Sequence, residues 1–216
     1  MTARIKYNRT FHLPWSLGRA DDDKVLKSVE HFVGRRVVVT EKLDGENTTI
    51  YSDGTCHARS LDSASHESQA WVRALAAQVG HLIPKGWRVC GENVFAFHSI
   101  PYDKLTSYFY VFGIYDENNV CLSWRETIEW AALLGLEVAP VIYESDWCEH
   151  VVKRCFYGES AFGDEQEGYV VRVVDSYHYD DFGTSVAKFV REQHVQPNAK
   201  HWRNRPVVPN TLRREL

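Results

Sequence analysis

Four β-branched residues in a row, Val37 to Thr40, constrain the fold of this chain more than any other feature. Such a run favours a buried strand, and Lys42 follows it, with an Asp-Gly turn at Asp44. Lysine is seldom placed at the end of a buried strand unless its amine serves a purpose, because its charge is costly to bury. The pattern therefore predicts a strand that carries Lys42 to an interior site. The alternative is a surface hairpin with a lysine before its turn.

The spacing Lys-x-Asp-Gly needs further support, since it should arise by chance in about one chain in twenty of this length. More short motifs follow it in chain order, and each borders a strand-like stretch. An ordered series of this kind is a stronger signal than any single member. The motifs are Arg59-Ser60, Gly91-Glu92-Asn93, Phe112 within residues 108–116, Glu167-Gly168, and Lys188 within residues 185–191.

Taken together, these motifs resemble the series found in covalent nucleotidyltransferases, and in particular in the ATP-dependent RNA ligase family. The likeness is greatest to the RNA ligase 2 branch, which includes phage ligases and RNA-editing ligases, since Glu41 and Asn47 also match that branch. It extends from about residue 35 to residue 192. The resemblance implies an enzyme that forms a covalent lysyl-AMP from ATP and seals RNA 5′-phosphate and 3′-hydroxyl ends.

Both the pattern and the resemblance indicate the fold class. Strands are mixed with helices without regular βαβ alternation, which favours an α+β fold over a doubly wound sheet. The resemblance implies the nucleotidyltransferase (ligase adenylation-domain) fold, in which antiparallel sheets clasp the nucleotide and helices lie outside. We expect one domain over residues 1–216, with no room after Lys188 for the oligonucleotide-binding domain of DNA ligases and capping enzymes.

Periodicity and capping signals predict several helices and strands. Residues 124–134 should form a helix, with Ser123 as N-cap and Glu126 completing a capping box. The Asp run at residues 21–23 suits the N-terminus of another helix, where carboxylates offset the dipole. The other predictions are an extended lead-in at 11–16, helices at 66–82 and 146–156, and strands at 87–93, 108–115, 120–122, 167–174 and 185–191.

The resemblance implies roles for the residues nearest the reaction. Lys42 would attack the α-phosphate, for which its amine must lose a proton. Burial and a nearby cation would lower its pKa, and Lys188 is the candidate cation and a partner for the phosphate. Glu167 would help to hold Mg²⁺ (or Mn²⁺), Glu92 would accept hydrogen bonds from the ribose, and Asp44 would support the loop or the RNA end. The structural alternatives are a solvent-facing strand end for Lys188 and a strand-initiating turn for Glu167.

Four further residues complete the predicted nucleotide and RNA site. Phe112 would stack on the adenine, and a core position among neighbouring aromatic rings is an equal alternative. Glu41 lies where the family reads the purine edge, mostly through the main chain. Arg59 would contact phosphates or the RNA 3′ end, and Asn47 matches a family position tied to RNA engagement.

One departure concerns the last motif of the family, which usually carries two lysines flanking one residue. Here Val186 occupies the first position, and only Lys188 remains. Arg191, Lys153 and Arg172 are the candidates to supply the missing charge. This departure affects the charge arrangement that the family usually has around the triphosphate, and it weighs more against the prediction of ligase activity than against that of nucleotide transfer.

Composition limits the partners and the environment. The chain carries 25 basic and 29 acidic residues, a net charge of -4, so contact with RNA depends on a local basic groove. Its five cysteines include no Cys-x-x-Cys pair, which argues against a zinc site, and their odd number favours reduced thiols in a cytoplasmic protein. No apolar run approaches the roughly 20 residues needed to span a bilayer, so we expect no membrane partner.

The C-terminal segment, residues 192–216, is basic and rich in proline, which favours extended structure. One interpretation is an RNA contact that combines phosphate binding with stacking, and the other is a strap packed on the catalytic domain. The residues concerned are His194, Lys200, His201, Trp202, Arg203, Arg205, Arg213 and Arg214.

Two other functions stay open at the level of the sequence. One keeps the chemistry and changes the acceptor to a DNA end, a cap-like end or a protein. The other is of a different class, a non-catalytic RNA-end-binding module, and the valine at position 186 is its best support. The RNA substrate, a partner protein that helps to grip it, and the choice of ATP over GTP do not follow from the sequence.

Overall fold

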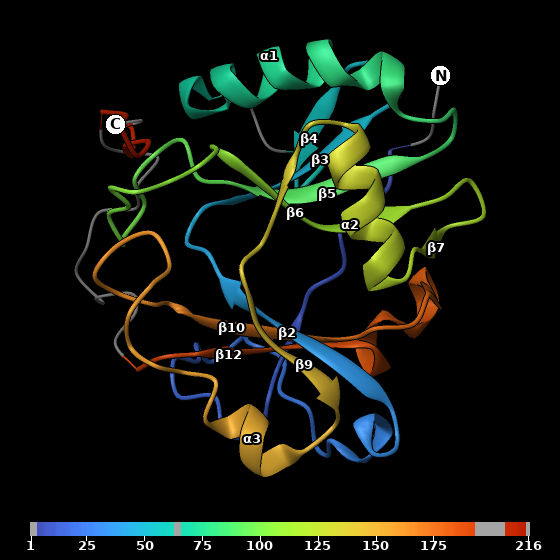
Figure 1. Ribbon diagram of the computed structural model, residues 1–216, viewed down its shortest axis with the longest axis vertical. Helices are drawn as coiled ribbons and strands as arrows, with labels where there is room; N and C mark the ends of the chain where they lie inside the picture. Colours follow the sequence, from blue (N-terminus) through green and yellow to red (C-terminus); the bar gives the residue numbers. More distant parts are fainter. Residues whose placement is uncertain (1–3, 63–65, 193–205, 215–216) are drawn as a thin grey trace.

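Two β-sheets face each other in the computed structural model, which describes residues 4–62, 66–192 and 206–214. Figure 1 shows the sheets one above the other, with helices on their outer sides. Within the described residues one sheet has five strands and the other seven, and all pairings are antiparallel apart from two short parallel ones. This arrangement confirms the predicted α+β fold.

The five-stranded sheet is built around the β-branched run. In order across the sheet its strands are β1 (Phe11–His12), β12 (Val186–Val190), β10 (Gly168–Val173), β2 (Arg36–Lys42) and β9 (Val141–Asp146). Val37 and Val39 on β2 are fully buried in a core that includes Phe32. Because successive side chains of a strand point to opposite faces, Thr40 and Lys42 face the other sheet.

The seven-stranded sheet packs against two helices. Its strands are β11 (Tyr177–His178), β7 (Val120–Cys121), β6 (Phe109–Tyr115), β5 (Arg88–Asn93), β3 (Glu46–Tyr51) and β4 (Cys56–Ala58), with β8 (Glu137–Val138) beside β6. The helices α1 (Ala70–Val79) and α2 (Trp124–Leu133) cover its outer face (Figure 1). A second core forms there, where Val72 and Ala131 from the helices join Val89 and Ile114 from the strands.

Local signals predicted two of the helices correctly. Helix α1 is flanked by the 3₁₀ turns Glu67–Gln69 and Gly80–Leu82, and together they span the predicted range. Ser123 caps α2, and its hydroxyl oxygen accepts from the Glu126 amide while the Glu126 carboxylate accepts from the Ser123 amide. Further 3₁₀ turns are Glu30–Phe32 and Tyr179–Thr184.

Two secondary-structure predictions are wrong, and tertiary contacts explain both. Residues 21–23 form a turn and not a helix, because the Asp23 carboxylate binds Arg9 and accepts from the Ala20 amide. Helix α3 (Glu149–Lys153) is shorter than predicted at both ends, and at its start Asp146 belongs to the edge strand β9, which pairs with β2.

The described residues include all the cysteines and a part of the basic C-terminal segment. All five cysteines lie in described residues and are free thiols. In the part of the chain that the structure describes, no helix is long and apolar enough to cross a membrane. Arg213 and Arg214 are exposed. The other residues of the predicted C-terminal RNA contact lie outside the described residues: His194, Lys200, His201, Trp202, Arg203 and Arg205.

Candidate functional site

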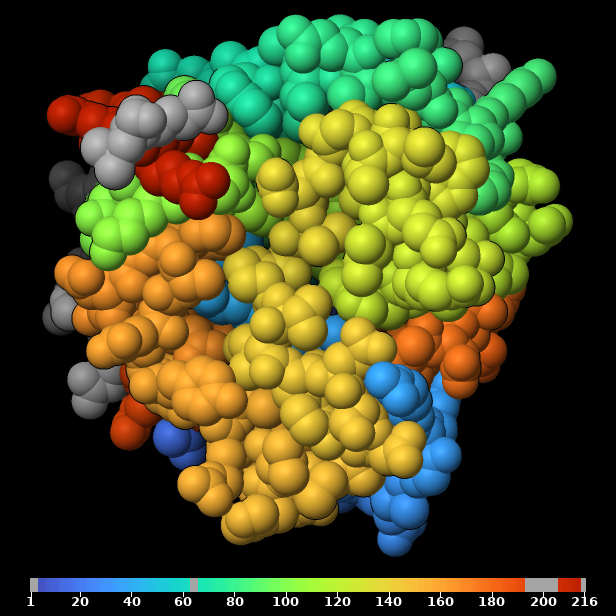
Figure 2. Space-filling view, viewed as in Figure 1, coloured from blue at the N-terminus to red at the C-terminus, as the bar shows by residue number. Residues whose placement is uncertain are grey.

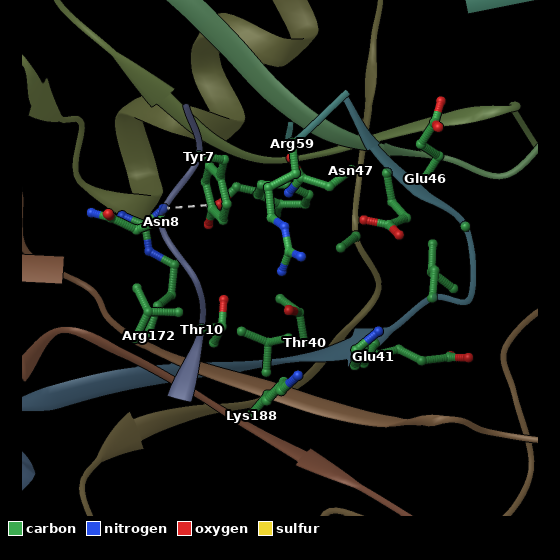
Figure 3. Close-up of a pocket in the computed structure, with 18 of the residues that line it drawn as sticks. Tyr7, Asn8, Thr10, Thr40, Glu41, Glu46, Asn47, Arg59, Arg172 and Lys188 are labelled. Atoms are coloured by element: carbon green, nitrogen blue, oxygen red, sulfur yellow. Dashed lines mark hydrogen bonds between the residues drawn. The ribbon is translucent and has the colours of Figure 1, made fainter. Parts of the chain in front are cut away.

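A cavity of about 470 Å³ lies between the two sheets, a size typical of sites for small ligands and cofactors. Figure 3 shows Arg59 reaching into this space from one side and Lys188 from the other. Asp44 and Glu167 do not line the cavity but lie beside its Lys42 wall. The predicted site residues that line it are Glu41, Lys42, Asn47, Arg59, Glu92, Phe112 and Lys188.

Lys42 ends β2 and points into the cavity. Its Nζ donates to Oε2 of Glu167 at 2.7 Å, across a separation of 125 residues in the chain. The register explains the contact, because Lys42 pairs with Gly168, the residue after Glu167. A Cβ at Gly168 would lie 2.0 Å from the Phe189 carbonyl oxygen, so only glycine lets β12 approach β10 this closely.

The surroundings of Lys42 correct the expected direction of its pKa. Burial lowers the pKa of Lys42, but Glu167, Glu92 and Asp44 together raise it, and the result is about 12. The pKa of Lys188 is lowered to about 8, first by burial and then by Lys42. Burial also raises the pKa of Glu92 to about 8. The prediction of a lowered Lys42 pKa is wrong because the sequence does not show how many carboxylates converge on this amine.

Asp44 fastens the turn after Lys42 to a neighbouring loop. Its Oδ2 accepts from the Ser99 amide at 2.7 Å, from the Ser99 hydroxyl at 2.7 Å and from the Ile100 amide at 2.8 Å. The Asp44 amide donates to the Tyr102 hydroxyl at 2.8 Å. These contacts fit the loop-supporting alternative of its prediction.

Aromatic side chains form one end of the cavity. Phe112 on β6 meets Tyr7 edge to face, with ring centroids 5.1 Å apart, and Tyr177 lines the same space. Phe112 also packs against the core of the five-stranded sheet. Its two predicted roles, packing and stacking on a base, are therefore compatible with one position.

The remaining predicted residues divide between the cavity and its surroundings. The Glu41 carboxylate turns away and accepts from the Ser160 hydroxyl at 2.5 Å and from the Ala161 amide at 2.9 Å. Its main chain is thus the part that faces the cavity. Oδ1 of Asn47 is buried and has no hydrogen-bond partner among the described residues, so it can accept from a ligand hydroxyl.

Val186, at the position of the absent lysine, lines the cavity and pairs with Arg172 in the sheet register. Of the three candidate replacements for the missing charge, Arg172 alone lines the cavity, and its guanidinium donates to three main-chain carbonyls. Lys153 binds a glutamate of its own helix α3, and Arg191 binds a glutamate outside the cavity. The missing charge is therefore not replaced by Lys153 or Arg191 in this structure.

Sequence reasoning missed the N-terminal wall of the cavity. Tyr7, Asn8 and Thr10 line it, and the chain then enters β1, which pairs in parallel with β12. Thr40 on β2 was also missed. The extended lead-in was predicted, but no spacing or motif distinguishes these residues, since a parallel edge pairing depends on the folded sheet.

A buried histidine stands next to Lys188 at this edge. His12 is the register partner of Lys188, and its Nδ1 lies 2.8 Å from the Ser16 hydroxyl, which accepts from the Val190 amide. Its Nε2 is 3.2 Å from Oδ2 of Asp23. Burial lowers the pKa of His12 to about 4, with a further contribution from Lys188. The imidazole is therefore neutral at physiological pH and ties β1 to β12.

The donors beside Lys42 suit a hard divalent cation. Mg²⁺ commonly takes one or two carboxylates together with substrate phosphates and water. Glu167 offers such a carboxylate, whereas that of Asp44 already accepts three hydrogen bonds. The described residues contain no group of three or more metal-ligating side chains, so phosphate oxygens and water would have to complete the coordination.

Comparisons with known proteins agree with this architecture. A family model described as RNA ligase matches residues 35–190. A Naegleria gruberi RNA ligase mutant with ATP and Mn superposes with a TM-score of 0.60 at 17% identity, over 87% of this chain and 61% of that chain. The Naegleria gruberi RNA ligase with PPi gives a TM-score of 0.58 at 19% identity, over 88% and 61%.

A further Naegleria gruberi mutant with ATP and Mn gives a TM-score of 0.56 at 19% identity, over 76% of this chain and 52% of that chain. The chain thus spans about half to three fifths of the length of these proteins. A sequence search of curated proteins finds no match. At these identities the structural likeness establishes the fold, and it confirms the predicted nucleotidyltransferase type.

Proposed function

The chain belongs to the RNA ligase family, whose model covers residues 35–190, and on that premise we propose that it is an ATP-dependent RNA ligase. In this proposal Lys42 forms a covalent lysyl-AMP, and the AMP then passes to an RNA 5′-phosphate. A 3′-hydroxyl displaces the AMP and closes the strand. The observation that carries the proposal is the position of Lys42. It ends strand β2, lines the cavity and lies among charged side chains that include Glu167 and Glu92.

Each of the predicted residues around the cavity suits one requirement of phosphoryl transfer. Such reactions depend mainly on positioning and on stabilising charge at the phosphate oxygens. Lys188 faces the cavity from β12, and Arg59 reaches toward it from the opposite side (Figure 3), so both can contact phosphates. Glu92 would accept from the ribose hydroxyls, and Phe112 would stack on the adenine.

The attack itself makes a demand on the Lys42–Glu167 ion pair. The amine must be neutral to form the N–P bond, while the P–O bond to pyrophosphate breaks. In the structure Glu167 accepts from Lys42 at 2.7 Å and favours the protonated amine. We infer that this pair opens and the proton leaves before attack. Mg²⁺ or Mn²⁺, held by Glu167 together with phosphate oxygens, would neutralise charge on the phosphates.

Two predicted residues face the acceptor in this proposal. Asn47 offers its buried Oδ1 to a hydroxyl of the nucleotide or the RNA end. Arg59 would bind phosphates or the RNA 3′ end, and Glu41 would present main-chain groups to the purine. The RNA ligase 2 branch, a cytoplasmic location and a partner protein that grips the substrate stay predictions.

The direct test is incubation with α-labelled ATP and Mg²⁺, followed by denaturing electrophoresis. Wild-type protein, cleared of bound AMP with pyrophosphate, should carry label, and Lys42→Ala should not. Lys85→Ala, which removes an exposed lysine far from the cavity, is the matched control and should label like wild type. Label on Lys42→Ala would exclude Lys42 as nucleophile.

A second candidate changes only the acceptor, to a DNA end, a cap-like end or a protein, and a third candidate binds RNA ends without catalysis. The third is favoured by Val186, because the cavity wall there lacks a charge that the family usually places near the triphosphate. Competition between RNA and DNA ends for AMP from the charged enzyme separates the two acceptors. Failure to release pyrophosphate from ATP would support a non-catalytic module that binds RNA ends.

A further inference from the structure

The turn that follows Lys42 is held from outside the two sheets. Asp44 binds the loop of residues 94–108 through three hydrogen bonds to its carboxylate and one from its amide to the Tyr102 hydroxyl. Leu43, only 3% exposed, packs in a third core with Ile100, Tyr102 and Leu105 from the same loop. The position of the Lys42 amine therefore depends on where this loop lies.

The loop has little regular secondary structure of its own, and the C-terminal residues 206–214, here called the strap, hold it in place. Asn210 is the central contact. Its Oδ1 accepts from the Tyr102 amide at 3.0 Å, its Nδ2 donates to the Val94 carbonyl at 2.8 Å, and its amide donates to the Phe95 carbonyl at 2.8 Å. Asn210 is 5% exposed, so these bonds are shielded from water.

Main-chain bonds continue the contact along both segments. The Phe97 amide donates to Val208, the Thr211 amide to Tyr102, and the Arg213 amide to Leu105. In Figure 2 the C-terminal residues, in red, lie directly against green residues at the upper left of the molecule. The strap lies outside residues 35–190, the range of the family model, so the family resemblance does not account for it.

We propose that Tyr102 and Asn210 are positioning residues through which the strap sets the place of the Lys42 nucleophile. Asn210 holds the main chain of Tyr102, and the Tyr102 hydroxyl holds the main chain of Asp44, two residues from Lys42. The route consists of two hydrogen bonds with side chains that are almost fully buried. This inference rests on the proposed lysyl-AMP chemistry.

The physical reason is the steep dependence of nucleophilic attack on distance. Reacting atoms must approach to about 3–3.5 Å in line, and a displacement of about 1 Å can cost about a hundredfold in rate. A buried amide that loses its acceptor seeks another partner, because an unpaired donor costs about 1–3 kcal/mol. Removing the Tyr102 hydroxyl should therefore shift the turn without removing any group that touches ATP.

The main test compares two single-hydroxyl deletions in the full chain. Tyr102→Phe removes the acceptor of the Asp44 amide. Tyr108→Phe is the matched control, because its hydroxyl donates to the Asn210 carbonyl at 3.1 Å but does not contact the nucleophile turn. Single-turnover lysyl-AMP formation at saturating ATP should slow about tenfold or more in Tyr102→Phe and less than about twofold in Tyr108→Phe, with the ATP concentration for half-maximal rate unchanged in both. Equal rates in the two variants would overturn the proposal.

The Asn210 variants test the other half of the route. Asn210→Asp keeps an acceptor for the Tyr102 amide and loses the donor to Val94, whereas Asn210→Ala loses both. The rate should fall further in Asn210→Ala than in Asn210→Asp. If the two lose thermal stability but keep the wild-type rate, the strap stabilises the fold and does not position Lys42.

Amide hydrogen exchange gives a measurement that does not depend on catalysis. Residues 42–46 should exchange faster in Tyr102→Phe and Asn210→Ala than in wild type and Tyr108→Phe, and unchanged exchange would overturn the inference. A wild-type protein that forms no lysyl-AMP would defeat the proposed function. The exchange result would still show whether the strap holds the turn.

Discussion

Lys42 and Lys188 lie on either side of β10 in the same sheet and face the same cavity, but their surroundings differ. Lys42 stands among carboxylates, with Glu167 at 2.7 Å, and its pKa is about 12 although burial lowers it. Lys188 stands at the β1 edge, forms no ion pair in the described part of the chain, and has its pKa lowered to about 8, mainly by burial. Burial alone therefore does not decide the charge of a lysine, because nearby carboxylates can reverse its effect.

The difference has a meaning for the proposed reaction. The Lys42 amine stays protonated until Glu167 moves away, and a protonated amine is not a nucleophile, so Lys42 is unreactive while this ion pair lasts. No ion pair among the described residues neutralises the charge of Lys188, so this charge can attract an anionic phosphate. This contrast between the two lysines predicts how substitutions at four positions change the stability of the protein or the pKa of Lys188.

Placing a second lysine on β12, two residues from Lys188, should be the change that destabilises the fold most. Val186 is 3% exposed and pairs with Arg172, so Val186→Lys would bury a charge opposite a like charge. We expect a loss of about 3 kcal/mol in the free energy of unfolding by denaturant titration, and no gain in lysyl-AMP formation. Val186→Met controls for size without charge. A Val186→Lys protein as stable as Val186→Met would contradict this expectation.

Removing the positive charge of Lys42, which lies among several carboxylates, should also destabilise the fold. Lys42→Met removes the ion pair between Lys42 and the almost fully buried Glu167. Because Lys42 keeps some exposure, we expect a loss of about 2 kcal/mol at pH 7, together with loss of the nucleophile. The double variant Lys42→Met, Glu167→Gln should recover part of that stability. No recovery would mean that the ion pair is not the source of the loss.

The corresponding substitution at Lys188, Lys188→Met, should change the free energy of unfolding in the opposite direction. Its folded pKa of about 8 lies below the ordinary value of 10.5, so at pH 7 the folded state bears the cost of a buried charge. Lys188→Met should therefore raise the free energy of unfolding by about 1 kcal/mol at pH 7. As the pH rises from 8 to 10.5, the folded wild type loses this proton before the unfolded chain does, and the advantage of the variant should disappear. A gap that stays constant with pH would contradict the lowered pKa.

The smallest effect should come from Asp23, whose carboxylate raises the pKa of Lys188. Asp23→Asn should lower the pKa of Lys188 further, by less than about one unit, because the partner is partly exposed. NMR titration of the Lys188 side chain measures this directly. Asp22→Asn, which changes a more exposed neighbour that binds Arg9, is the matched control and should leave Lys188 unchanged.

Local sequence signals predicted the parts of the fold that depend on neighbouring residues. The Ser123 capping box, the α1 helix and the β-branched strand before Lys42 each follow from propensity or from contacts within one turn. Seven of the predicted site residues, from Glu41 to Lys188, line the cavity. The edge strand β9 escaped prediction because its pairing with β2 depends on a partner about 100 residues away.

The amino-acid sequence by itself determined which chemical groups enter the site and on which strands, because β-branched runs, glycines and turn residues act locally. The tertiary structure alone decided their charge states, since the pKa of Lys42 reflects carboxylates from three separate segments. It also decided that the N-terminal segment lines the cavity and that the C-terminal strap contacts the loop whose Tyr102 binds the turn after Lys42. Electrostatic and long-range hydrogen-bond effects depend on distances between remote segments, and only the folded chain sets those distances.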